Sequence, residues 1–149
     1  MMAKSEYVAA VRDAPIADLR PLVRSAQDVR ELVGPDMETL TQEQIRVIVL
    51  STRLAVMDVV TVYQGTVDTA LVRQAELFRP AILLNAPSII LVHNHPSGDA
   101  TPSAEDRAMT EQAREAGALL QIGVLDHVIV ACGGAVSLRE LMPWEEIKR

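Results

Sequence analysis

Apolar residues recur along the chain in a pattern that predicts strands alternating with helices. Segments rich in aliphatic and β-branched residues predict four buried strands, over residues 45–51, 54–65, 88–93 and 123–132. A short fifth strand is predicted over residues 135–138, after a hairpin turn at Gly133 and Gly134. Strands that alternate with helical segments indicate an α/β layered domain, with helices packed against one sheet.

The first predicted helix follows Ser25, a candidate N-cap, and is expected to stop at the Gly34–Pro35 pair. A second helix is predicted over residues 72–85, where apolar residues recur at helical spacing. Pro80 lies inside it and is expected to kink or divide it, because proline lacks the backbone N–H that an interior helical position donates.

The clearest helical pattern covers residues 103–120. Small and apolar residues are expected to form its packing side, and they are Ala104, Ala108, Ala116 and Leu119. Residues 40–44, just before the first strand, are predicted to form a further helical turn. Internal repeats and low-complexity segments are absent from the sequence.

The length of 149 residues favours one domain with one hydrophobic core. Hydrophobic residues make up 49% of the chain and aromatic residues only 3%, so the core is expected to be aliphatic. The first residues combine mixed polarity with weak periodicity. We therefore expect residues 1–24 to form a peripheral N-terminal segment and residues 25–149 to form the domain.

Several function classes are disfavoured by composition. No apolar run reaches the ~20 residues that span a bilayer, and the N-terminus lacks a signal-peptide pattern, so a cytoplasmic location without membrane partners is expected. The single cysteine, Cys132, excludes an internal disulfide and a Cys-pair zinc site. A net charge of −6 argues against a general nucleic-acid binder, which needs a basic surface to displace phosphate counterions.

Two of the three histidines, His93 and His95, stand two residues apart at the end of a predicted strand. Alternate strand residues point to the same side, so both imidazoles should project together from the strand end. Ligands of α/β sheets bind at such ends. The spacing therefore predicts a site that can chelate one divalent ion.

Ser103 and Asp106 follow at the start of the long predicted helix and allow two interpretations. In the first, the spacing is a capping box, in which both residues only stabilise the helix N-terminus. In the second, Asp106 folds back toward the histidines and completes a His-His-Asp set with one vacant position. Catalytic zinc sites commonly combine three protein ligands with one water.

The same residues resemble a known metal motif. His-x-His, seven residues, then Ser-x-x-Asp is similar to the signature of the JAMM/MPN+ metalloproteases. The longer string "HNHPSGDATPSAED", with "GVLDHVIV" downstream and "GTV" upstream, resembles the RadC branch of that group. The resemblance runs from about residue 25 to residue 141, and its central part is the most specific.

This resemblance implies a JAB/MPN fold, a curved mixed β-sheet flanked by helices that is similar to the cytidine-deaminase architecture. It implies zinc, held by His93, His95 and Asp106. It also implies a metallohydrolase that cleaves peptide or isopeptide bonds through a metal-activated water. The expected partner is a protein or peptide substrate, such as a ubiquitin-like protein.

The resemblance also implies roles for residues outside the ligand set. Glu43, just ahead of the first strand, matches the family glutamate that moves the proton, and Ser103 matches the serine that stabilises the oxyanion. Glu76 is the rival base: RadC relatives read Pro-Arg-Glu there, whereas this chain reads Gln-Ala-Glu, with Arg73 as a substitute for the missing arginine. The choice between Glu43 and Glu76 stays open.

Three further residues near the motif are expected to be structural. His127, in the string that matches the family Leu-Asp-His, is predicted to be a hydrogen-bonded structural residue that faces away from Asp126. Asn94 is expected to fix the loop, and Asp99 to form the turn. A zinc deaminase is excluded because the sequence lacks Pro-Cys-x-x-Cys.

Two other functions remain as alternatives. The first is a DNA-repair-associated factor, although the residues before Glu43 are too few for the helix-hairpin-helix region that RadC proteins usually carry. The second is a scaffold that keeps the fold without catalysis. A homodimer is plausible if the third core strand and the long helix leave a sheet edge open.

Overall fold

The structure, a computed structural model, describes residues 19–65 and 72–145. Most of the predicted N-terminal segment 1–24 and two residues of the upstream "GTV" string lie outside these ranges. The elements follow one another as α2 (Ala26–Met37), β1 (Glu43–Leu50), β2 (Val56–Gly65), α3 (Gln74–Leu83), β3 (Ser88–Asn94), α4 (Ala104–Leu120), β4 (Gly123–Ala131), β5 (Gly134–Ser137) and α5 (Leu138–Leu141).

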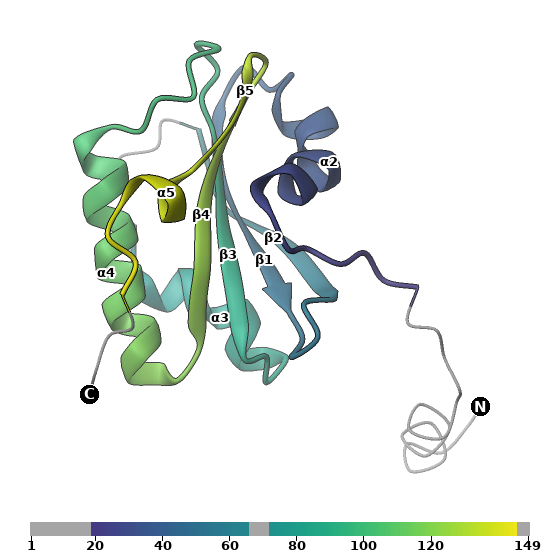
Figure 1. Cartoon of the computed structure of the whole chain (residues 1–149), viewed down its shortest axis with the longest axis vertical. Helices are drawn as coiled ribbons and strands as arrows, with labels where there is room; N and C mark the ends of the chain where they lie inside the picture. The colour runs from purple at the N-terminus through teal and green to yellow at the C-terminus, as the bar shows by residue number, and fades with distance from the viewer. Residues whose placement is uncertain (1–18, 66–71, 146–149) are drawn as a thin grey trace.

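Five strands form one mixed sheet in the order β2-β1-β3-β4-β5. β3 and β4 pair in parallel, and the other neighbours are antiparallel. Helices α3 and α4 cover one face of the sheet, and α2 covers the other (Figure 1). The predicted α/β class, a mixed sheet flanked by helices, is confirmed.

The side chains of each central strand alternate between two apolar clusters. In β1, Val47 and Val49 pack beneath α3 and α4, whereas Ile48 and Leu50 pack beneath α2. Both faces of the central strands are therefore covered, which explains why β1 and β3 are mostly continuous apolar runs rather than an alternating pattern. The core is aliphatic, as predicted, with Phe78 its one fully buried phenylalanine among the described residues.

The first helix is longer than predicted, because it continues through Pro35 and ends at Met37. Pro35 is exposed, whereas Met37 is fully buried under the sheet. A charge-assisted hydrogen bond of 2.7 Å from Arg30 Nε to Glu38 Oε1 also spans the last turn. Burial of Met37 and this contact together outweigh the single hydrogen bond that proline removes.

The predicted helical turn at residues 40–44 is wrong, because Glu43 and Gln44 already belong to β1. They pair with Gly65 and Gln64 of β2, so sheet hydrogen bonds take the backbone that local propensity assigned to a turn. This extension of β1 carries Glu43 to the end of the sheet where β3 finishes.

Helices α3 and α4 and the edges of the sheet also differ from the prediction. Pro80 does not divide α3, which is continuous and in which Pro80 itself is buried. The packing side of α4 is Met109, Thr110, Ala113 and Gly117 together with Asp106, whereas Leu119 is 80% exposed. β3 is central, so the open edges of the sheet belong to β2 and β5.

In the described ranges, every helix is too short or too polar to span a bilayer.

Candidate metal centre

The two histidines lie where β3 leaves the sheet. His93 continues the face of Ile89 and Leu91, which packs beneath α3 and α4. His95 lies one residue beyond β3, and its backbone N–H donates to the Val130 carbonyl of β4 at 3.0 Å. The sheet therefore determines where both imidazoles lie, as the two-residue spacing predicted.

Asp106 reaches the histidines from the first turn of α4. Its Oδ1 lies 3.3 Å from His93 Nδ1, and its Oδ2 lies 3.3 Å from His95 Nε2. The three residues each offer one ligand atom, and these atoms lie within 4.8 Å of one another. The structure thus brings together the His-His-Asp set that the sequence predicted, and the set could hold a metal ion.

The spacing of these atoms is compatible with a metal ion between the three side chains. Tetrahedral zinc with bonds of about 2.0–2.1 Å holds neighbouring ligand atoms about 3.3–3.4 Å apart. Both ring nitrogens of His93 are buried, and neither makes a hydrogen bond with a described residue. Buried polar atoms are normally paired, so an unpaired imidazole aimed at a carboxylate indicates a site for a cation.

A hydrogen bond selects the tautomer of His95. Its Nδ1 lies 2.8 Å from the backbone carbonyl oxygen of Asp99, which can only accept, so Nδ1 carries the proton. The lone pair of Nε2 then faces Asp106. A backbone carbonyl behind a histidine is the usual device that orients a metal ligand. The carboxylate of Asp99 instead accepts from Thr101, which confirms Asp99 as a turn former.

Asp106 also completes the capping box at the start of α4. Its Oδ2 accepts from the backbone N–H of Ser103 at 2.9 Å, and Ser103 Oγ accepts from the backbone N–H of Asp106 at 3.1 Å. Ser103 is exposed, and its hydroxyl proton is not used by any hydrogen bond among the described residues. The capping interpretation and the metal interpretation therefore both fit the geometry.

Contacts between Asp106 and the two histidines shift the pKa values at this site. Burial alone would raise the pKa of Asp106, but contacts with His93, His95 and the Ser103 backbone outweigh it and hold the pKa well below its ordinary value. Contact with Asp106 raises the pKa of His95 above its ordinary value, although burial opposes this. The space between Asp106 and His95 therefore favours a positive charge, either a proton or a metal ion.

Glu43 stands beside this set. Residues Ile45 and His93 are partners across β1 and β3, so antiparallel pairing leads from Glu43 toward His95. The negative charge of Glu43 is close enough to raise the pKa of His95. Glu43 is half-buried, and its carboxylate makes no hydrogen bond or ion pair that would hold it elsewhere among the described residues.

Asn94 fixes the backbone on both sides of Glu43. Its Oδ1 accepts from the Gln44 N–H at 2.6 Å, and its Nδ2 donates to the Gln42 carbonyl at 3.0 Å. The sequence placed Asn94 in the loop as a structural residue. The structure shows that it ties the end of β3 to the start of β1, which a single sequence does not reveal because the two partners are 50 and 52 residues away.

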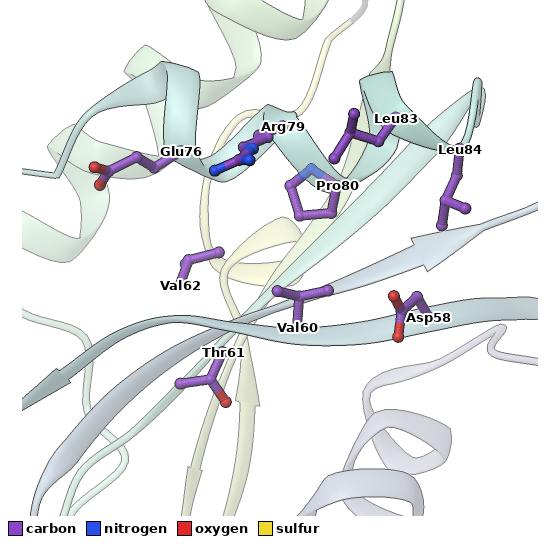
Figure 2. A pocket seen from close by; sticks show the side chains of 9 residues that line it. All are labelled: Asp58, Val60, Thr61, Val62, Glu76, Arg79, Pro80, Leu83 and Leu84. Atoms are coloured by element: carbon purple, nitrogen blue, oxygen red, sulfur yellow. The ribbon is translucent and has the colours of Figure 1, made fainter.

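Glu76, the rival base, is engaged in a different place. Its carboxylate accepts a short hydrogen bond from the Tyr63 hydroxyl and lies 3.8 Å from the Arg73 guanidinium. Figure 2 shows Glu76 at one end of a groove between β2 and α3, with Arg79 on the α3 side and the apolar side chains of Val60 and Val62 on the β2 side. The Tyr63 and Arg73 contacts give Glu76 a structural role in joining α3 to β2.

Behind the centre lies a buried pair that sequence reasoning recognised only in part. His127 is fully buried, and its Nδ1 lies 2.7 Å from Thr110 Oγ1. Burial lowers the pKa of His127 to about 3, so its imidazole is neutral. Asp126 faces the other side of the sheet, where it accepts from Ser137 at 2.7 Å. The prediction of His127 as a structural residue matches this geometry, whereas Thr110 was missed.

Comparison with known proteins decides the family. Residues 23–143 match the family described as RadC-like JAB domain. The chain belongs to the RadC-like JAB domain family. Relatives of this RadC-like domain include the UPF0758 protein of Roseiflexus sp. (strain RS-1), 50% identical over 123 residues, and that of Chloroflexus aggregans (strain MD-66 / DSM 9485), 48% identical over 118 residues. A UPF0758 protein of Desulfitobacterium hafniense (strain DSM 10664 / DCB-2) is 43% identical over 122 residues.

These matches cover most of the RadC-like chain but only part of each relative. The three alignments include 83%, 79% and 82% of this chain. They include 53%, 52% and 54% of the relatives, so the chain spans about half the length of the relatives it matches. The name UPF0758 states no activity. The family of the domain is therefore established, and its chemistry must be argued from the residues.

Proposed function

We propose that this RadC-like domain is a zinc-dependent hydrolase that cleaves peptide or isopeptide bonds. One observation carries the proposal: His93, His95 and Asp106 converge at ligand spacing at the end of the sheet. Glu43 and the unused hydroxyl proton of Ser103 stand beside them. A cation site with both a proton acceptor and a proton donor at its margin is what hydrolysis of an amide requires.

The donor set supports zinc as the metal. Two imidazoles and one carboxylate are the kind of ligands that catalytic zinc accepts, with a fourth position left for water. When bound, zinc lowers the pKa of that water from ~15.7 to about 7 and polarises a substrate carbonyl. Among the three side chains, His93 and Asp106 are buried and His95 is half-buried, so the set opens toward solvent at His95.

Glu43 is the residue that we propose moves the proton. Its carboxylate has no competing partner among the described residues, and Asn94 holds the backbone on both sides of it. It accepts the proton of the attacking water and returns it to the leaving amine, which would otherwise depart as a high-energy anion. Glu76 is unsuited to this role, because its carboxylate is engaged by Tyr63 and Arg73.

Ser103 is the residue that we propose stabilises the oxyanion. The oxygen of its hydroxyl accepts from the Asp106 N–H, which leaves the hydroxyl proton free to donate. A donor that is already oriented by the helix cap needs no reorganisation when negative charge develops on the substrate oxygen. The cap therefore supports the proposed role of Ser103, because it orients the hydroxyl group that would donate to the oxyanion.

The substrate that we propose is a protein or a peptide, and the family resemblance suggests a ubiquitin-like protein as one candidate. The test uses purified full-length protein, metal analysis and a library of internally quenched peptides together with a ubiquitin–lysine isopeptide. We expect one zinc per chain and slow amide hydrolysis. Glu43→Gln should retain the zinc and lose turnover by about 10²- to 10⁴-fold, the usual contribution of a general base.

Glu76→Gln is the matched control, since it removes a carboxylate from α3 without touching the three proposed ligands. It should retain turnover. Full turnover by Glu43→Gln would refute the role of Glu43. A zinc-loaded wild-type protein that cleaves none of these amides would favour the scaffold alternative.

A further inference from the structure

A buried chain of hydrogen bonds runs behind the proposed metal centre. Thr110 Oγ1 lies 2.7 Å from the Asp106 carbonyl oxygen and 2.7 Å from His127 Nδ1. Thr110 and His127 are both fully buried. The chain thus joins the helix turn that carries Asp106 to strand β4, on the face of the sheet that α4 covers.

Donor and acceptor chemistry sets the direction of every proton in this chain. A carbonyl oxygen can only accept, so the Thr110 hydroxyl donates to Asp106. The Thr110 oxygen then accepts from His127, which must carry its proton on Nδ1. The opposite nitrogen of His127, Nε2, is therefore left with a lone pair.

The ring of His127 lies beside a proposed ligand. The rings of His127 and His93 have centroids 6.0 Å apart and planes inclined by 24°, a stacked arrangement. The Nε2 atoms of both rings are buried, and neither has a hydrogen-bond partner among the described residues. His93 approaches Asp106 through Nδ1. The His127 ring therefore limits how the His93 ring can tilt away from Asp106.

We propose that Thr110 and His127 are positioning residues of the metal centre. Thr110 holds the first turn of α4, and with it Asp106, against β4. His127 orders Thr110 and backs the ring of His93, so the two residues reach two different ligands from one side. The inference rests on the proposed function, because the positions that it explains are those of metal ligands. Residues that orient ligands in this way typically contribute about 10- to 100-fold to metal affinity.

The test measures zinc affinity by competition with a chromophoric chelator. Thr110→Val keeps the shape of the side chain but removes the hydroxyl, and it should weaken zinc binding by about 10- to 100-fold. Thr110→Ser restores the hydroxyl and should return the affinity toward the wild-type value. His127→Leu should weaken binding as well, and the double variant should lose less than the two losses combined, since both residues belong to one chain.

Ser137→Ala is the matched control. Ser137 is buried, and its hydroxyl donates to Asp126 at 2.7 Å on the opposite face of the sheet. Ser137 Oγ also accepts from the Glu140 N–H at 3.3 Å, so Ser137→Ala loses two hydrogen bonds, as Thr110→Val does, but next to no proposed ligand. We expect a loss of stability with wild-type zinc affinity. A purely structural role for Thr110 would make the two variants behave alike.

A second measurement, made on the wild-type protein, tests the inference if Thr110→Val does not fold. Nitrogen-15 NMR of the histidine rings in the wild-type protein should show His127 as the Nδ1–H tautomer, with and without zinc. The Nε2–H tautomer, or wild-type zinc affinity in folded Thr110→Val, would overturn the inference and leave the proposed function standing. Wild-type protein that binds no zinc would instead overturn the proposed function, and the inference with it.

Discussion

Ser103 and Asp106 bind each other reciprocally, backbone to side chain in both directions, at 2.9 and 3.1 Å. The same Asp106 carboxylate lies 3.3 Å from the nearest nitrogen of each of the two histidines. A helix cap and a metal ligand are often treated as rival explanations of one acidic residue. Here the two explanations are compatible, because the cap fixes the carboxylate at the place where the histidines meet.

Substitutions at Ser103 should separate its role as a helix N-cap from its proposed role in stabilising the oxyanion. Ser103→Ala removes the side-chain acceptor and should lower the free energy of unfolding by about 1 kcal/mol. Ser103→Asp supplies another good N-cap and should restore most of that stability. Neither alanine nor an ionised aspartate can donate a hydrogen bond from its side chain to an oxyanion, so both variants should lose amide hydrolysis. Denaturant unfolding and peptide turnover, measured on the same preparations, check this. Turnover that recovers in Ser103→Asp would mean that only the cap matters.

Removal of the metal should lower thermal stability without unfolding the domain. A ligand present at 100 times its Kd stabilises a protein by about 2.7 kcal/mol, which corresponds to a melting shift on the order of 10 °C for a domain of this size. Differential scanning calorimetry with and without a chelator measures this shift. Asp106→Asn should abolish it. Asp99→Asn is the control: it changes a carboxylate in the neighbouring loop that accepts only from Thr101, and the shift should persist.

Asn94 should affect turnover more than zinc binding. Asn94→Ala removes the two hydrogen bonds that hold the backbone on either side of Glu43. A proton acceptor displaced by about 1 Å can cost on the order of 100-fold in rate, so kcat should fall steeply. Zinc affinity should change little, since none of the three ligands bonds to the Asn94 side chain. A variant that loses zinc and activity in parallel would show that Asn94 supports the ligands instead.

Asp126 should give a pH dependence of stability that is separate from the metal centre. Burial raises the pKa of Asp126, although Ser137 and two backbone N–H groups partly oppose it. The folded state therefore holds this proton more tightly than the unfolded chain, whose aspartate pKa is ~3.9. The resulting stabilisation is fully present below the unfolded pKa and is lost as pH rises through the raised folded pKa.

The comparison with Asp126→Asn isolates this effect, because every other group titrates alike in the two proteins. The variant cannot titrate at this position, and its altered hydrogen bonds add an offset that does not depend on pH. The stability of the wild type relative to Asp126→Asn should therefore fall as pH rises above about 4. Urea unfolding at several pH values measures it. A difference that is flat across this range would contradict the raised pKa.

Local pattern was sufficient for the parts of the fold that depend on local chemistry. The β-branched runs predicted all four long strands, and the two-residue spacing of His93 and His95 predicted their convergence. The errors came where tertiary contacts outweigh propensity. Glu43 and Gln44 entered β1 because β2 offered backbone partners, and Met37 extended a helix past a proline because its burial outweighed the lost bond.

The packing side of α4 shows a different limit. The apolar pattern predicted Ala104, Ala108 and Leu119 on the packing side, but all three are exposed, whereas Ala116 packs against the core as predicted. The buried side includes two polar residues, Asp106 and Thr110. They pack inward because Asp106 contacts His93 and His95, and Thr110 contacts His127. Hydrophobic periodicity cannot recognise a polar site as interior. No local pattern predicts the contact of Thr110 with His127, because the two residues belong to different elements, α4 and β4.

The hydrogen bond from His95 to Val130 would make uptake of a metal ion at the proposed site inexpensive in conformational entropy. His93 sits inside a strand, His95 extends the parallel ladder by one bond, and Asp106 is locked in a capped first turn. These three segments have already given up their conformational freedom, so uptake of the ion requires almost no further ordering of the backbone. Small zinc fingers unfold when their metal is removed, whereas this domain should keep its fold when an ion leaves the proposed site.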